Sequence, residues 1–418
     1  MAWKWLDPAE IAQRDRGYAV PPEVWETVRR IIARVRVEGD AALRRLTLEL
    51  DGVAPDAFRV AEETVDRAYA DLDLPTRAAL ETAARRIAVY QERTLSRSSF
   101  FPEENGVILG EVFRPLAAVG IYVPGGRAPL PSTVLMTAVP ARVAGVERIA
   151  LATPPRRDGS VHPAILAAAR IAGVTEIYRI GGAQAVAAFA LGTESVPRVD
   201  KVVGPGNVYV TTAKQQVFGL VGIDLLAGLS EVAVLADEPA EARWLAADLM
   251  AQGEHDPLSA AYLITPSRAL GEAVAVELAR LGADLPFPLG GGMILVRDVA
   301  EGLHILNRIA PEHCGICLPE PWTVLGQVRA AGSIFLGHGS PQGFGDYLAG
   351  PSHVLPTGAT ARFSSPLTAR DFQVSSSVLF RPEGRAVDLL NQARHLAETE
   401  GLAAHALALR MREEVGLR

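Results

Sequence analysis

Between residues 106 and 336, short apolar stretches alternate with helix-like runs, and this alternation leaves few folds open to the chain. The runs are about ten residues long, which is typical of the crossover between two parallel strands. The first series contains the expected strands Ala117–Val123, Ile149–Ala152, Ile177–Ile180, Lys201–Val203 and Ile223–Leu226. We therefore predict βαβ units and a parallel sheet.

A second series of the same kind follows residue 231. Its expected strands are Val232–Leu235, Ala261–Ile264, Met293–Val296, a stretch near Ile316, and Ser333–Leu336. A helix from Glu238 to Met250 opens the series, and a last helix is expected to reach Ala330. Two successive series predict an α/β fold with two doubly wound, Rossmann-like but atypical domains that face each other across a cleft.

The segments before and after these two series show a different pattern of apolar residues. Residues 1–100 show helical spacing of apolar side chains, with new helices expected at Pro22, Gly39 and Pro75. The chain ends in an expected strand, Val374–Phe380, and two helices. We divide the chain into an N-terminal helical region with a strand extension, two Rossmann-like domains and a C-terminal tail, at residues 1–115, 116–230, 231–365 and 366–418.

Charge and composition exclude several classes of partner. The formal net charge of −7 provides no basic surface for nucleic acid. No uncharged apolar run is long enough to span a bilayer, and the first residues lack the apolar segment of a secretory signal. Two cysteines in 418 residues exclude a disulfide scaffold. We therefore expect a cytoplasmic protein without a membrane partner.

Three glycine-rich turns follow expected strands and precede expected helices. They are Pro124-Gly125-Gly126, Gly181-Gly182-Ala183-Gln184 and Gly204-Pro205-Gly206-Asn207. Ligands of open α/β sheets bind beyond the carboxyl ends of the strands, where the N–H groups of a helix start attract anions. None of the turns matches G-x-G-x-x-G, so they are either an atypical cofactor site or tight turns that need positive φ.

A polar hexapeptide, from Ala251 to Asp256, closes the helix that opens the second series. Gln252 and His255 are three positions apart and share one face of a last helical turn, whereas Glu254 points elsewhere. Imidazole and an amide oxygen can both bind a metal such as zinc. The pair is therefore either half of a metal site or a polar helix end.

Glu312 and His313 follow Pro311 directly after an expected helix. In such a turn both side chains can point into a cleft, and a carboxylate beside an imidazole can act as a general base near neutral pH. Without supporting residues, the same pair is a solvated loop.

Other polar residues occur in two segments near the C-terminus. Asp346 and His353 lie in a stretch rich in glycine and proline, which makes each a candidate ligand. Glu400 and His405 lie at a helix start, where they are either functional or an ordinary terminal charge and surface histidine.

Cys314 and Cys317 form a C-x-x-C motif, which can be redox-active or half of a zinc site. There is no second cysteine pair, and the stretch is typical of a strand that packs into a core. We favour the core strand.

Together these segments resemble the histidinol dehydrogenase family over nearly the whole chain. The motifs that carry the resemblance are Ile121–Gly126, Gly181–Gln184, Gly204–Val210, Ser230–Val232, Gln252–Asp256, Ala310–His313, Gly345–Tyr347, His353–Thr357 and Glu400–His405. Their number and their order along the chain make the match specific.

The resemblance implies an NAD-dependent oxidation of L-histidinol to L-histidine through an aldehyde, the last step of histidine biosynthesis. It implies one zinc ion per site, NAD as the second cofactor, and a homodimer in which the C-terminal tail completes the partner's site. In this family the first Rossmann-like domain is the NAD side, and the second carries zinc and the catalytic residues.

The resemblance also implies a role for each matching residue. The zinc ligands would be Gln252, His255, Asp346 and His405. The substrate would contact these four ligands together with Ser230, His313 and Glu400. NAD would be held by Tyr122, Gln184 and Asn207. His313 would be the general base in both oxidations, and Glu312 would activate the water that attacks the aldehyde.

Two other functions stay open from the sequence. Residues around the expected pocket depart from the family's usual ones, for example Cys314-Gly315 and Ser352. A paralogue could therefore oxidise another small amino alcohol or diol with the same zinc and NAD, although Glu400 favours a substrate with an amine. A non-catalytic nucleotide-binding or scaffold protein of the same fold is disfavoured by the full set of ligands and catalytic residues.

Overall fold

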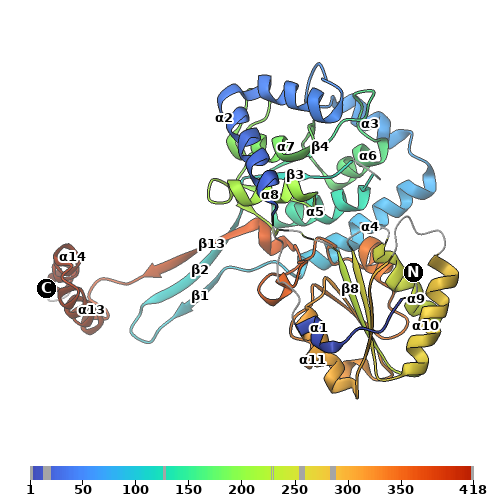
Figure 1. Ribbon diagram of the computed structural model, residues 1–418. Helices are drawn as coiled ribbons and strands as arrows, with labels where there is room; N and C mark the ends of the chain where they lie inside the picture. Colours follow the sequence, from blue (N-terminus) through green and yellow to red (C-terminus); the bar gives the residue numbers. More distant parts are fainter. Residues whose placement is uncertain are drawn as a thin grey trace. The chain divides into compact units, whose positions relative to one another are not determined.

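The computed structural model describes residues 3–12, 20–125, 129–226, 228, 230–253, 259–282 and 289–415 (Figure 1). The chain divides into two compact units, a larger one of Met1–Thr94 and Leu116–Phe372 and a smaller one of Leu95–Pro115 and Gln373–Arg418. The division into four regions at residues 115, 230 and 365 stays a prediction. Among the described residues, no helix combines the length and apolar composition needed to cross a membrane.

The first sheet of the larger unit is parallel, with the strand order β5-β4-β3-β6-β7. Its strands are β3 (Ala118–Tyr122), β4 (Arg148–Thr153), β5 (Glu176–Arg179), β6 (Lys201–Val203) and β7 (Gly222–Ile223). The central β3 pairs through Gly120 with Ala150 of β4 and Val202 of β6. This arrangement confirms the parallel sheet. Its last strand is shorter than predicted because the chain leaves the ladder at Asp224, whose carboxylate binds Lys214 instead.

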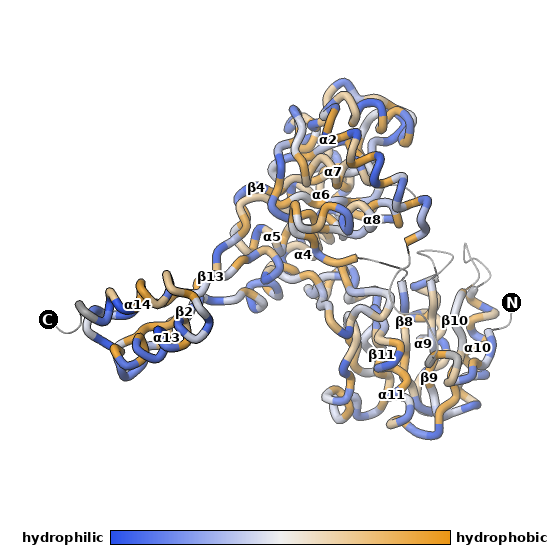
Figure 2. Tube along the Cα trace, turned by 60° about the vertical axis from the view of Figure 1, so that its left-hand side comes forward, coloured by the Kyte–Doolittle hydropathy of each residue, from blue (hydrophilic) through white to orange (hydrophobic). Residues whose placement is uncertain are grey.

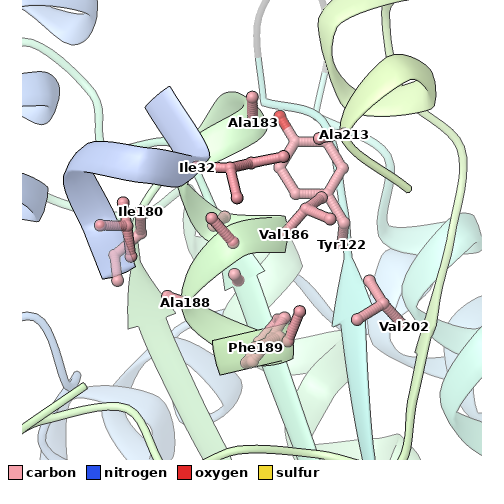
Figure 3. Close-up of a cluster of buried hydrophobic side chains, with 14 of the residues drawn as sticks. Ile32, Tyr122, Ile180, Ala183, Val186, Ala188, Phe189, Val202 and Ala213 are labelled. Atoms are coloured by element: carbon pink, nitrogen blue, oxygen red, sulfur yellow. The ribbon is translucent and has the colours of Figure 1, made fainter. Parts of the chain in front are cut away.

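Helices pack around this sheet and supply its core. They are α2 (Pro22–Asp51), α3 (Glu62–Ala70), α4 (Leu74–Glu92), α5 (Pro131–Ala144), α6 (Pro163–Ala172), α7 (Gly182–Leu191) and α8 (Val208–Val217). Figure 3 shows Phe189 of α7 gathered with Ile32 of α2 and Tyr122 of β3 in one buried cluster. A Cβ on Gly120 would come within 2.6 Å of the Phe189 ring, so this glycine lets α7 approach the sheet. The expected helix break at Gly39 appears as a kink inside α2, with φ of 50°.

The second sheet of the larger unit is also parallel, with the order β10-β9-β8-β11-β12. Its strands are β8 (Glu231–Ala236), β9 (Ala260–Thr265), β10 (Gly290–Leu295), β11 (His313–Cys317) and β12 (Ser333–Leu336). One face carries α1 (Pro8–Ala12) and α11 (Val299–Ile309), and the other carries α9 (Ala242–Gly253) and α10 (Arg268–Leu281) (Figure 1). Helices on both faces explain why the strands are apolar along their length.

The predicted last helix of this series, up to Ala330, is wrong. The segment forms two short 3-10 turns, Pro321–Thr323 and Leu325–Gln327. The side chain of Asn307 binds the backbone on both sides of Val328, donating to Gln327 O at 2.8 Å and accepting from Arg329 N at 2.7 Å. These bonds hold the segment in a conformation that a continuous helix could not adopt. The chain then passes through β12 to α12 (Gln342–Phe344), a π-helical turn at Gly345–Ala349, and 3-10 turns at Thr360–Arg362 and Ala369–Phe372.

The smaller unit contains an antiparallel sheet of order β1-β2-β13 and two helices. Its elements are β1 (Ser99–Pro102), β2 (Ile108–Pro115), β13 (Gln373–Phe380), α13 (Val387–Thr399) and α14 (Ala403–Val415). The strand and the two helices predicted near the C-terminus are thus confirmed. Figure 2 shows hydrophobic positions among hydrophilic ones on α13 and α14, and the large exposed hydrophobic side chains there are Leu389, Leu396, Leu407 and Met411.

Candidate active site

Glu312 and His313 lie at the start of β11, immediately after α11. The helix ends at Ile309, and Ala310 turns the chain in a left-handed conformation with φ of 50°. The chain then enters the sheet, where His313 pairs with Val232 of β8. Glu312 and His313 expose only 8% and 4% of their surface. The pair is therefore a buried carboxyl–imidazole pair and not a solvated loop.

Gln252 and Asp346 contact the two sides of the His313 ring. Gln252, in the last turn of α9, is 1% exposed, and its Nε2 lies 3.1 Å from His313 Nδ1. Asp346, in the π-helical turn, places Oδ1 at 3.2 Å from His313 Nε2. The ring of Phe335 stacks on the imidazole with 5.9 Å between the centroids. The structure thus assembles four of the expected site residues, including Glu312 beside the imidazole, from three separate segments.

With the Gln252 amide oriented as it is here, these contacts match one neutral tautomer of His313. The amide Nε2 of Gln252 can only donate a hydrogen bond, so Nδ1 of the imidazole accepts it. The ring proton then lies on Nε2 and is donated to the Asp346 carboxylate. Both ring nitrogens are therefore engaged by residues expected to bind metal.

Burial and neighbouring charges shift the pKa values of the catalytic pair. Burial raises the pKa of Glu312 to about 7, although the nearby His313 and the Glu231 N–H at 3.2 Å act in the opposite direction. Burial alone would lower the pKa of His313, but its hydrogen bond to Asp346 and the Glu312 carboxylate raise it above the ordinary value. Glu312 can therefore gain or lose a proton near neutral pH, as general acid–base catalysis requires.

The side-chain oxygen atoms of Gln252 and Asp346 are suitable ligands for part of a zinc site. The Gln252 Oε1 atom is buried and has no hydrogen-bond partner among the described residues, and a buried carbonyl oxygen of this kind is costly to leave unpaired. Amide and carboxylate oxygens, as in Gln252 and Asp346, are ligands that zinc accepts. His255 and Glu254 lie outside the described residues. The described part of the chain contains no group of three His, Cys, Asp or Glu side chains placed to hold a metal ion.

The remaining expected substrate and metal residues are distributed over both units. Ser230 lies directly before β8, and its carbonyl accepts a hydrogen bond from Ala260 N at 3.1 Å. Glu400 caps the C-terminus of α13, and His405 lies in the first turn of α14. Both are exposed and belong to the smaller unit, whereas Gln252, His313 and Asp346 belong to the larger one.

His353, the other candidate ligand of its loop, uses both ring nitrogens within the protein. Its Nδ1 lies 3.0 Å from the backbone oxygen of Asp346, and its Nε2 lies 3.1 Å from Thr133 Oγ1. The imidazole thereby fixes the backbone of the turn that carries Asp346. His353 also lines a cavity of about 200 Å³ together with Asp346 and Phe335.

The three residues expected to bind NAD lie at the carboxyl ends of the first sheet. Tyr122 ends β3, and its hydroxyl accepts a hydrogen bond from Gly182 N at 3.2 Å, at the start of α7. Gln184, two residues further and in the first turn of α7, is 1% exposed, and its Oε1 has no hydrogen-bond partner among the described residues. Asn207 caps α8 by accepting from the backbone N–H groups of Tyr209 and Val210. Each of these residues thus fixes or adjoins a helix N-terminus, where an anion is favoured.

Sequence reasoning missed the buried ion pair that shapes the third glycine-rich turn. Lys214 Nζ lies 2.6 Å from Asp224 Oδ1, and both side chains are 1% exposed. The same ammonium donates to Gly204 O at 2.9 Å, and Asp224 Oδ2 accepts from Gly204 N at 2.7 Å. Both sides of the Gly204 backbone are therefore fixed by one ion pair. Nothing in the sequence pattern marks two opposite charges ten positions apart as partners.

The residues expected to bind NAD and the Glu312–His313 pair lie at opposite ends of the strands that carry them. The turns near Tyr122, Gly182 and Gly204 follow β3, β5 and β6, at the carboxyl ends that ligands of such sheets normally use. Glu312 and His313 instead lie at the amino end of β11. The general rule for α/β sheets therefore predicted the position of the first group but not of the second.

Cys314 and Cys317 point to opposite faces of β11. Cys314 packs in the cluster with α11, and Cys317 packs in the cluster with α9 and α10. Both are buried free thiols, and burial raises the pKa of Cys314 far above its usual range and that of Cys317 to about 12. The structure supports the core-strand interpretation, because neither thiol can reach the other or form a thiolate readily.

Comparison with known proteins finds similarity to one family along nearly the full chain. The model of the family described as "Histidinol dehydrogenase" matches residues 15–413. The histidinol dehydrogenase of Moorella thermoacetica is 50% identical over 98% of this chain and 99% of its own. That of Thermus thermophilus is 48% identical over 95% of this chain and 96% of its own.

A solved structure agrees with this result. The crystal structure of histidinol dehydrogenase from Elizabethkingia anophelis superposes with a TM-score of 0.94 at 31% identity, covering 98% of this chain and 97% of the other. The match covers residues of both the larger and the smaller unit. On these grounds the chain belongs to the histidinol dehydrogenase family of oxidoreductases.

Proposed function

We propose that this chain is a zinc- and NAD-dependent histidinol dehydrogenase that oxidises L-histidinol to L-histidine through histidinal, reducing two NAD per substrate. The observation that carries the proposal is the buried network in which His313 contacts Gln252 and Asp346 beside Glu312. The reaction is the last step of histidine biosynthesis, which favours a cytoplasmic location.

The zinc ion would be held by Gln252, His255, Asp346 and His405. The buried, unpartnered Oε1 of Gln252 supports this role, because a cation would satisfy it. When bound, zinc supplies a Lewis acid that can hold the amine and imidazole nitrogens of the substrate. Ser230 and Glu400 would complete the substrate contacts, with the Glu400 carboxylate facing the substrate amine.

His313 and Glu312 then divide the proton transfers. His313 takes the hydroxyl proton of the alcohol while hydride leaves its carbon, which yields the aldehyde. Glu312 takes a proton from the water that adds to the aldehyde carbon, His313 returns its proton to the former carbonyl oxygen, and a geminal diol results. His313, neutral again, takes a proton from this diol as the second hydride leaves, and the carboxylic acid that forms loses its proton to give the carboxylate. A ring nitrogen of His313 must therefore be free of its present contact with Gln252 or Asp346 during each oxidation.

NAD would be held by Tyr122, Gln184 and Asn207. When bound, it accepts the hydride in both oxidations. The start of α7 supports this site, because the backbone N–H groups at a helix start attract a pyrophosphate. The buried amide oxygen of Gln184, unpartnered among the described residues, provides a further acceptor for a ligand hydroxyl or amide.

The assembly would be a homodimer in which the smaller unit of each copy completes the partner's site with Glu400 and His405. Exposed hydrophobic side chains on that unit support this, since Leu396 is 66% exposed and Leu379 is 72% exposed. Sedimentation analysis should give the mass of a dimer, and a variant that combines Leu396→Glu with Leu379→Glu should shift it toward the monomer. A monomeric wild-type protein would contradict the shared site.

The decisive experiment measures stoichiometry. The purified protein should form two NADH per L-histidinol consumed, a chelator should abolish turnover, and zinc should restore it. Turnover of another amino alcohol or diol with no NADH from L-histidinol would overturn the proposed substrate. Absence of both bound zinc and turnover would favour a non-catalytic member of the fold.

A further inference from the structure

A second buried glutamine contacts Gln252. Gln342 exposes 2% of its surface, and its Oε1 accepts a hydrogen bond from Gln252 Nε2 at 3.2 Å, across 90 positions of sequence. We propose that Gln342 is a positioning residue that orients the amide of Gln252 so that its oxygen, and not its nitrogen, is presented to zinc. The proposal rests on the zinc site inferred above.

The orientation of the Gln252 amide decides whether it can bind a metal. Its oxygen has lone pairs to offer, whereas its NH₂ group is a donor of two hydrogen bonds and no ligand. Both of these bonds are made in the structure, one toward His313 Nδ1 at 3.1 Å and one to Gln342 Oε1 at 3.2 Å. The oxygen at the other end is left buried and without a partner among the described residues. A rotation of the amide by half a turn would remove the hydrogen bond to Gln342 Oε1 and direct the NH₂ group at the metal.

His313 alone cannot fix this orientation. An imidazole nitrogen accepts a hydrogen bond in one tautomer and donates one in the other, so it is compatible with either end of an amide. In the structure the side chain of Gln342 presents its carbonyl oxygen to Gln252 Nε2, while its own Nε2 is buried without a hydrogen-bond partner among the described residues. An acceptor at this position favours the orientation in which the Gln252 NH₂ group faces Gln342 and the Gln252 oxygen is left for the metal.

Gln342 is held in place independently of its side chain. Its backbone N–H donates to the carboxylate of Asp248, which lies on α9 one turn before Gln252. The segment that begins at Gln342 continues directly into the π-helical turn with Asp346. Gln342 thus joins the helix that carries one expected zinc ligand to the turn that carries another.

Two substitutions separate the acceptor from the volume of the side chain. Gln342→Met keeps the length but removes the acceptor, and Gln342→Glu keeps an acceptor at the same place. Gln327→Met, at an exposed glutamine outside the network, is the matched control. Zinc affinity of the full-length protein is measured by competition with a chromogenic chelator, and the cobalt-substituted protein gives a visible spectrum that reports the ligand set.

We expect Q342M to lower zinc affinity about 10- to 100-fold, as is usual when a partner of a metal ligand is lost, and to change the cobalt spectrum. Q342E and Q327M should keep the wild-type affinity and spectrum. If Q342M proves too unstable to purify, Gln342→Ala carries the same prediction. Wild-type affinity in the acceptor-free variant, or an equal loss in Q342E, would overturn the positioning role while leaving the zinc site intact. A wild-type protein that binds no zinc would overturn the zinc site itself, and the positioning role with it.

Discussion

His313 Nε2 lies 3.2 Å from Asp346 Oδ1, although the two residues are 33 positions apart. The contact joins the start of β11 to the π-helical turn after β12. It places the proposed general base in direct contact with a proposed zinc ligand. Metal binding and base strength are therefore coupled, because any movement of the Asp346 carboxylate changes the hydrogen bond that raises the pKa of His313.

The different roles proposed for Glu312 and His313 predict that substitutions of these residues affect the two oxidations unequally. Glu312→Gln removes the base for water but leaves the imidazole, so oxidation of histidinal should fall about 10²- to 10⁴-fold while oxidation of L-histidinol changes far less. His313→Asn should lower both oxidations by a similar factor. Single-turnover kinetics started from the alcohol and from the aldehyde measure each half-reaction. Equal losses in both half-reactions of Glu312→Gln would contradict its role as the base for water.

The raised pKa of Glu312 predicts the pH dependence of aldehyde oxidation. The carboxylate must be deprotonated to accept a proton from water, and burial raises its pKa to about 7. The rate from histidinal should therefore rise with pH through the pKa of Glu312, and it should fall at least tenfold per pH unit below it, because His313, whose pKa is also raised, must be deprotonated as well. A rate profile at saturating NAD measures this limb, and Glu312→Gln should remove the contribution of Glu312 and leave that of His313. A profile of wild type that is flat between pH 5 and 8 would argue against Glu312 as the base.

The close approach of Gly204 to Tyr122 predicts a strict need for glycine. Gly204 has φ of 114°, and a Cβ there would lie 2.1 Å from the backbone oxygen of Tyr122. Gly204→Ala should displace the end of β3 and weaken NAD binding, with a strain cost of about 1–3 kcal/mol in stability. Gly219→Ala is the control, because it has φ of 98° but no atom within 4 Å of the added Cβ. Titration with NAD should give a lower affinity for Gly204→Ala than for Gly219→Ala. Equal affinities in the two variants would show that the close approach of Gly204 to Tyr122 does not affect NAD binding.

The sequence predicted the repeating parts of this fold well. The alternation of apolar strands and helices is a local pattern, so both parallel sheets followed from it. The break at Gly39 followed from the glycine itself. The segment before Ala330 was misassigned because its conformation depends on Asn307, a residue outside the window that local spacing samples.

The candidate site was predictable only in part, and for a related reason. Gln252 and Glu312 stand in recognisable motifs, yet their burial and their contacts with His313 arise from packing of α9 against the second sheet. Gln342 has no motif of its own, because its contact with Gln252 spans 90 positions. Resemblance to a family identified the residues in motifs, whereas residues that act through others emerged only from the structure.

The buried pair of Lys214 and Asp224 predicts the largest loss of stability outside the catalytic network. Lys214→Met keeps the length of the side chain but leaves Asp224 as an uncompensated buried charge, and removes the donor to Gly204 O. Breaking a buried pair by removing one partner typically costs about 3–5 kcal/mol, far more than an exposed pair is worth. Arg29→Met, which breaks an exposed pair with Glu26 at 2.8 Å, is the control and should change the free energy of unfolding little, because solvent screens such a pair. Urea unfolding measures both variants. Because Asp224 also accepts from Gly204 N, Lys214→Met should weaken NAD binding as well, whereas a loss of stability at unchanged NAD affinity would show that the turn keeps its shape without the ion pair.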